Sequence, residues 1–68
     1  MAERLGNRLH ELRTERGLTQ AGLAEMVEVS RKTINTVENG IFVPSTLLAL
    51  KIARALGLPV EEIFSLED

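Results

Sequence analysis

The segment that most constrains how this chain folds is residues 18–40, which read LTQAGLAEMVEVSRKTINTVENG. Thr19 is suited to cap a helix N-terminus, because its hydroxyl can accept a hydrogen bond from a free backbone N–H of the first turn. Apolar residues follow on one helical face, at Leu23, Ala24 and Val27. This half of the segment predicts a short helix with one face turned toward a core.

A second short helix is predicted after a tight turn. Residues 28–29 interrupt the apolar pattern, and Ser30 offers another N-cap directly after them. Ile34 and Val37 supply the inward face of this helix, which we expect to end before Gly40. The segment therefore predicts two short helices joined by a tight turn.

The N-terminal region allows two interpretations. Leucines recur there at helical spacing, which predicts a first helix from about Arg4 or Asn7 to Arg16. Alternatively, residues 1–5 could be extended and pair with residues 65–67 as a short terminal β-ribbon. Both interpretations remain open from the sequence.

The C-terminal half predicts two more helices. Ser45 is a suitable N-cap for a helix over Thr46–Leu56, and Gly57 is suited to end it. Residues 60–64 predict a short fifth helix. The expected fold is an all-α, five-helix domain spanning residues 1–68, with the short terminal β-pairing as an open addition.

Composition excludes several classes of site. The 68 residues contain no cysteine and a single histidine, so neither a disulfide nor a zinc cluster is expected. The chain has no basic-then-apolar leader and no apolar run near the roughly 20 residues that a membrane span needs. A cytoplasmic location without a membrane partner is therefore expected.

The sequence also lacks residues in an arrangement suited to catalysis. His10 is expected on the polar side of the first helix, with no cysteine or serine elbow to form a nucleophile with it. Glu61 and Glu62 are adjacent in the chain, so on a helix they do not face each other as a catalytic acid and base would. We expect no enzymatic activity, no cofactor and no small-molecule ligand.

A family resemblance covers nearly the whole chain, from about residue 7 to residue 64. The sequence resembles the lambda repressor and Cro-like helix-turn-helix family, also called the xenobiotic response element type. The residues that fall on its pattern are Gln20, Leu23, Ala24, Val29, Ser30, Ile34 and Glu38. The resemblance implies a short bacterial or phage regulator with a lambda-repressor-like domain, whose helix-turn-helix spans about residues 19–39.

The resemblance implies sequence-specific binding of double-stranded DNA. Such a regulator would act as a homodimer on a palindromic operator, most simply as a repressor. Three alternatives remain open: an antitoxin, the controller of a restriction system, or a helical adaptor that binds protein instead of DNA. The adaptor would bind protein through Leu47, Leu50 and Phe42, although core packing of Phe42 is the expected arrangement.

The net charge of −2 is unusual for a protein that binds a polyanion. The distribution of charge partly answers this, since residues 1–56 carry eight basic and six acidic residues, a local charge of +2. Arg31 and Lys32 stand in a stretch, residues 29–37, that contains no acid. The modest excess predicts few phosphate contacts and a shallow dependence of affinity on salt.

Base-reading side chains are expected at the start of the second helix of the motif, which would enter the major groove. Arg31 can present two parallel donors to guanine, and Lys32 can donate to the same base edge or to a phosphate. Thr33 and Thr36 each carry a hydroxyl for a base edge and a methyl group for thymine. These four residues are the predicted base-reading set.

Backbone phosphates are expected to be contacted by residues around that helix, because such contacts set register without reading sequence. The predicted phosphate-binding residues are Gln20, Ser30, Asn35 and Asn39. The family resemblance further implies an ion pair between Arg13 and Glu38 that clamps the recognition helix to the first helix. The sequence departs from the family pattern at Glu28, which stands in the turn where many relatives have glycine.

Apolar side chains spread around the fourth helix beyond what one core face needs, which indicates either deep burial of the helix or a twofold interface. The dimerisation region is predicted to span about residues 47–66. Its candidate residues are Leu47, Leu50, Leu58, Val60, Ile63 and Phe64.

Overall fold

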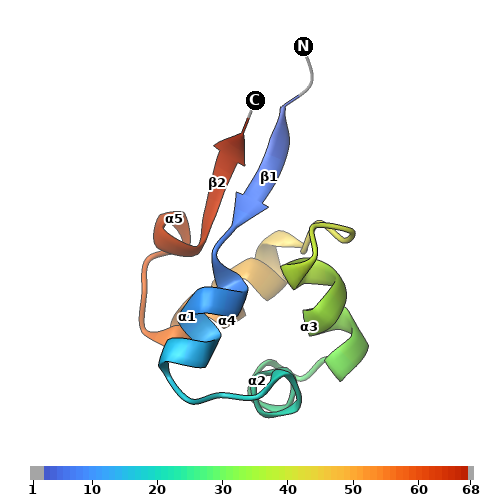
Figure 1. Ribbon diagram of the computed structural model, residues 1–68, viewed down its shortest axis with the longest axis vertical. Coiled ribbons are helices and arrows are strands. Elements are labelled where there is room, and N and C mark those ends of the chain that lie inside the picture. The colour runs from blue at the N-terminus through green and yellow to red at the C-terminus, as the bar shows by residue number, and fades with distance from the viewer. Residues whose placement is uncertain (1–2, 68) are drawn as a thin grey trace.

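The computed structural model describes residues 3–67, in which five helices form one body and two strands extend from one end of it (Figure 1). The elements in chain order are β1 (Arg4–Asn7), α1 (Leu9–Glu15), α2 (Gln20–Val27), α3 (Arg31–Glu38), α4 (Thr46–Leu56), α5 (Val60–Ile63) and β2 (Phe64–Glu67). The fold is mostly helical, with five helices as predicted, but it is not purely α-helical because of the small sheet.

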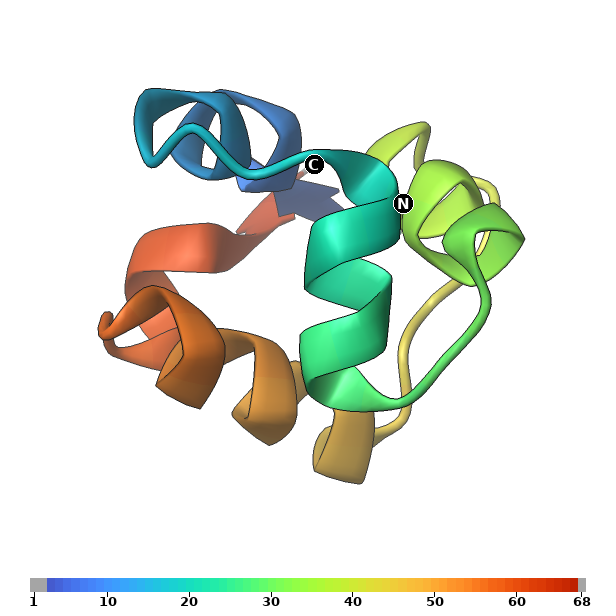
Figure 2. The same ribbon diagram turned by 90° about the horizontal axis from the view of Figure 1, so that it is seen from below.

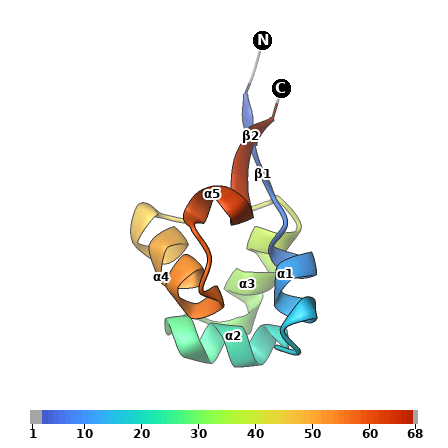
Figure 3. The same cartoon turned by 90° about the vertical axis from the view of Figure 1, so that its left-hand side faces the viewer.

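The two strands pair antiparallel, with Arg4 opposite Glu67 and Asn7 opposite Phe64. The predicted first helix is present as α1, but it begins at Leu9, so the predicted start at about Arg4 or Asn7 is wrong. The alternative of a terminal β-ribbon is correct in kind. The predicted N-terminal strand of this ribbon began at Met1, and residues 1–2 lie outside the described part of the chain. Figure 3 shows the ribbon rising from the body beside α5.

Asn7 explains why α1 starts where it does. Its Oδ1 accepts the backbone N–H of Leu9 at 3.0 Å, so it supplies a partner at the first turn of α1. Its Nδ2 donates to the carbonyl of Val37 at 3.0 Å, near the end of α3. One side chain thus joins the strand, the first helix and the end of α3.

Side-chain caps fix the starts of the three central helices, as the sequence predicts. The Thr19 hydroxyl accepts the Gly22 N–H at 2.9 Å, and the Ser30 hydroxyl accepts the Thr33 N–H at 3.2 Å. Ser45 caps α4 in the same way, with Leu48 as donor at 3.1 Å. Each such cap stabilises its helix by about 1 kcal/mol.

The turn between α2 and α3 has a left-handed residue. Glu28 has φ 63° and ψ 44°, which in a non-glycine residue costs roughly 1 kcal/mol. Its carboxylate lies 3.2 Å from the Lys51 ammonium of α4, an exposed pair that offsets little of this cost. The turn forms nevertheless, and α2 and α3 pack closely against each other.

The core lies between the helices, and α2 lies at the end of the body opposite the ribbon, where it packs against α3 and α4 (Figures 1 and 2). The largest fully buried side chains of the core are Leu9, Leu23, Val27, Ile34, Val37, Ile52 and Ile63. Because both helices of the motif contribute to this core, the exposed face of α3 is held rigidly. Among the described helices, none combines the length and apolar character needed to cross a bilayer.

Candidate nucleic-acid interface

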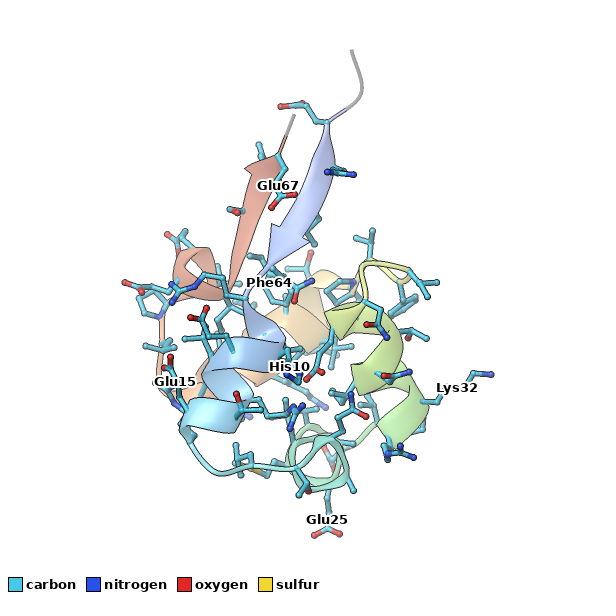
Figure 4. The ribbon with its side chains drawn as sticks, viewed as in Figure 1. His10, Glu15, Glu25, Lys32, Phe64 and Glu67 are labelled. Atoms are coloured by element: carbon cyan, nitrogen blue, oxygen red, sulfur yellow. The ribbon has the colours of Figure 1, made fainter. Side chains whose placement is uncertain are left out.

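The exposed edge of α3 carries two basic side chains at its start. Arg31 and Lys32 are both exposed, and neither side chain makes a hydrogen bond or ion pair with another residue of the range 3–67. Lys32 extends away from the body of the molecule (Figure 4). Opposite them Ile34 and Val37 are buried, so packing of α3 fixes the direction in which the basic residues project.

The two threonines of the predicted base-reading set are less exposed. The Thr36 hydroxyl bonds the carbonyls of Lys32 and Thr33 at 3.1 and 3.0 Å. The Thr33 hydroxyl lies 3.0 Å from the Ser30 hydroxyl, beside the turn. Both threonines are half-buried. In the free protein their hydroxyls therefore already have hydrogen-bond partners on α3 or in the turn, whereas the side chains of Arg31 and Lys32 have none among residues 3–67.

The predicted phosphate-binding residues, apart from Ser30, form one connected polar edge across α2 and α3. Gln20 Nε2 donates to Asn35 Oδ1 at 3.2 Å, and Asn39 Nδ2 donates to the same oxygen, also at 3.2 Å. Gln20 Nε2 also donates to Glu38 Oε1 at 3.0 Å. Both amide hydrogens of Gln20 are therefore used inside the protein, so a phosphate at this site would have to displace one of these bonds or use the free backbone N–H groups of α2.

A buried ion pair supports this edge from behind. Arg13 Nε lies 2.5 Å from Glu38 Oε2, with the two side chains 8% and 3% exposed. Arg13 also donates to the Leu18 carbonyl at 2.7 Å. Arg13 and Glu38, which the family resemblance predicts to pair, thus tie α1 to the end of α3 and to the segment before α2.

The ionised state of Glu38 is favoured by its donors. Burial acts to raise its pKa, but hydrogen bonds from Arg13, Gln20 and His10, together with the charge of Arg13, outweigh burial. The pKa of Glu38 is therefore held below its ordinary value. The carboxylate is charged at neutral pH and balances the arginine beneath the interface.

Acid should weaken the fold at this pair. Because the folded pKa of Glu38 lies below its unfolded value, the unfolded chain binds more protons between the two values. The stabilisation is complete above the ordinary glutamate range and is lost as pH falls through the folded pKa. We expect urea unfolding of the wild type to lose more stability between pH 7 and pH 3 than that of Glu38→Gln. Equal losses in the two proteins would show that the pair does not produce this dependence.

His10 belongs to the same cluster, which the sequence interpretation missed. Its Nδ1 lies 3.2 Å from Glu38 Oε1 and 3.1 Å from Arg13 Nη2. The contact between His10 and Glu38 joins residues 28 positions apart. The position of His10 three residues before Arg13 places it on the same face of α1, and this was the available signal.

The predicted interface residues differ in exposure within the protomer. Ile63 and Phe64 belong to the core, at 1% and 8% exposed, although Phe64 also lines a surface groove described below. Leu58 and Val60 are partly buried against the core, whereas Leu47 and Leu50 are 65% and 55% exposed. The α4 helix therefore does leave apolar surface uncovered.

The exposed leucines of α4 lie on two different grooves. Leu50 lines an apolar groove of about 320 Å³, here called the α4–α5 groove, together with Leu5, Val43, Pro44, Thr46, Ala49, Val60 and Phe64. Leu47 lines another groove, beside the turn, that includes Phe42 and Thr33. Phe42 is 46% exposed, contrary to the prediction that it packs on the core, because its loop lies across the surface between α3 and α4.

Comparisons with known proteins agree with this geometry. A family model described as Helix-turn-helix matches residues 9–63. The chain is 45% identical over 62 residues to the HTH-type transcriptional regulator YgzD of Bacillus subtilis, a match that covers 91% of this chain and 94% of YgzD. The chain belongs to the Cro/C1-type helix-turn-helix family. It is a DNA-binding transcriptional regulator and not an enzyme.

Further relatives of this Cro/C1-type regulator come from archaea and bacteria. An HTH-type transcriptional regulator of Methanothermobacter thermautotrophicus is 51% identical over 61 residues, covering 88% of each chain. Among solved structures, the restriction-modification controller protein C.AhdI of Aeromonas hydrophila superimposes with a TM-score of 0.77 at 40% identity. That match covers 81% of this chain and 83% of C.AhdI.

Proposed function

We propose that this Cro/C1-type regulator is a repressor that binds a palindromic operator as a homodimer, with an α3 helix in each of two successive major grooves. The observation that carries the proposal is the exposure of Arg31 and Lys32, whose side chains have no partner within residues 3–67, at the start of a rigidly held α3. An arginine there can bond guanine O6 and N7 through two parallel N–H groups. Occlusion of a promoter by the bound dimer, in the cytoplasm, is the simplest means of repression.

The polar edge of Gln20, Asn35 and Asn39 is proposed to follow the phosphate backbone beside that groove. Its amides are already held in place by one another, so little ordering is needed when they meet DNA. Ser30 lies at the other end of α3, where it is exposed and caps the helix. Its hydroxyl can contact a phosphate while it keeps that cap.

The twofold contact is proposed to form through the α4–α5 groove. Leu50 and Val43 are exposed residues of this groove, whose apolar lining also includes Leu5, Val60 and Phe64. Burying such a surface against a second copy would stabilise a domain of only 68 residues, whose own core is small. Residues 1–68 would then act as a single DNA-binding and dimerising domain.

Control of a restriction-modification system is a second candidate, favoured by the 40% identity to C.AhdI over most of both chains. The two candidates share the same dimer and the same reading helix. They differ only in which promoters contain the operator.

Base-reading and phosphate-binding roles can be separated on an operator duplex and on single base-pair variants of it. Arg31→Ala should remove about 1–3 kcal/mol of preference at one base pair per half-site. Gln20→Ala should weaken binding to all of these duplexes alike, because a phosphate contact carries no sequence information. Fluorescence anisotropy titrations measure both effects. The reverse pattern would contradict the assigned roles.

A further inference from the structure

His10 is the single histidine of the chain, and nothing in the proposed function uses it. Its side chain is 69% exposed, and its Nδ1 lies 3.2 Å from Glu38 Oε1. The same Glu38 oxygen accepts from Gln20, which in turn bonds Asn35. His10 therefore extends the polar edge of Gln20, Asn35 and Asn39 onto α1.

Two contacts of the imidazole ring meet at the same nitrogen, Nδ1. In the neutral Nε2–H tautomer Nδ1 accepts from Arg13 Nη2, whereas in the protonated ring Nδ1–H donates to Glu38 Oε1, so one contact replaces the other. In both states Nε2–H has no partner among residues 3–67 and is free for an outside acceptor, to which the charged ring is the stronger donor.

We propose that protonated His10 donates Nε2–H to a DNA phosphate, as an additional backbone contact that strengthens as pH falls. This inference rests on the proposed placement of the backbone along Gln20 and Asn39. The charged groups that face the ring are Arg13 on its own helix and Glu38 from α3, while α2 contributes the neutral Gln20 to the cluster. Arg13 and Glu38 offset each other, so the charge gained by His10 meets the phosphate largely uncompensated.

The expected effect is a pH dependence of DNA affinity. The imidazole of a histidine changes charge between about pH 5 and pH 8, and binding a phosphate favours the charged form. From pH 8 to pH 6 at constant ionic strength, affinity should rise about two- to fivefold per protomer, the range for an exposed charge pair. The slope of log affinity against log salt should steepen by about 0.9 per protomer.

Three variants test the origin of the effect. His10→Gln should bind equally at both pH values, and His10→Lys should bind at pH 8 as tightly as the wild type does at pH 6. The matched control is the double variant His10→Gln, Glu15→His, which moves the histidine to the far end of α1. Glu15 is exposed and projects away from α3 (Figure 4), so this variant should also lose the pH dependence of binding.

The measurement is an anisotropy titration of each protein at pH 6 and pH 8, on a selected operator duplex and on a scrambled duplex of equal length. An unchanged pH dependence in His10→Gln, or a wild-type dependence in the double variant, would overturn the inference. Loss of preference for the operator over the scrambled duplex would instead contradict the proposed function. The scrambled duplex still tests His10, because phosphate contacts do not depend on sequence.

Discussion

Arg13→Ala is expected to destabilise the fold by about 3–5 kcal/mol, since it leaves a buried carboxylate without its partner. Glu38 is 3% exposed and accepts two bonds from Arg13. The variant also removes the bond from Arg13 to the Leu18 carbonyl, which holds the segment before α2. Urea unfolding at a fixed protomer concentration measures the loss, because dimerisation would couple to folding.

Two comparisons test whether the loss of stability comes from burial of the ion pair. Arg8→Ala breaks an exposed pair with Glu11 on the same helix and should cost at most about 1 kcal/mol. The double variant Arg13→Leu, Glu38→Leu should recover much of the stability, because it removes both charges together. If Arg13→Ala costs no more than Arg8→Ala, the ion pair does not clamp α3 to α1.

Leu50→Glu is expected to abolish dimerisation with little effect on the protomer fold. Leu50 is 55% exposed in the protomer, so a carboxylate there remains hydrated until a second copy covers the α4–α5 groove. Burying that charge should weaken the dimer by about 3 kcal/mol or more, roughly a hundredfold or more in its dissociation constant. Sedimentation equilibrium measures the shift, and operator affinity should fall with it.

The matched control is Leu47→Glu on the same helix. Leu47 is 65% exposed but lines the groove beside the turn instead of the α4–α5 groove. Leu47→Glu should therefore leave the sedimentation of the dimer unchanged. A wild type that sediments as a monomer at high micromolar concentration, or a dimer that survives Leu50→Glu, would show that the proposed interface is wrong.

Local signals in the sequence were sufficient to predict the central helices. Capping residues such as Thr19, Ser30 and Ser45 act within three residues of their partners, so the starts of α2, α3 and α4 follow directly from the chain. The strands could not be decided in this way. Leu5 fits a helical spacing equally well, and its partner Leu66 lies 61 positions along the chain.

The site was predictable to the extent that it lies on one helix. The projection of Arg31 and Lys32 follows from the inward residues of α3, but the link from His10 to Glu38 depends on how α1 crosses α3. Likewise, hydrophobicity alone does not distinguish buried Ile63 from exposed Leu50. Those distinctions come from tertiary packing, which spacing along one element does not determine.

The central claim is that α3 reads an inverted repeat as part of a dimer, with Arg31 in direct contact with a base. Selection of bound sequences from a random duplex pool, by the wild type and Arg31→Ala in parallel, tests it most directly. We expect the wild type to enrich an inverted repeat with half-sites about 10 base pairs apart, and Arg31→Ala to lose one position in each half-site. Enrichment of no repeat at low salt and high protein concentration, or the same repeat with both proteins, would contradict the claim.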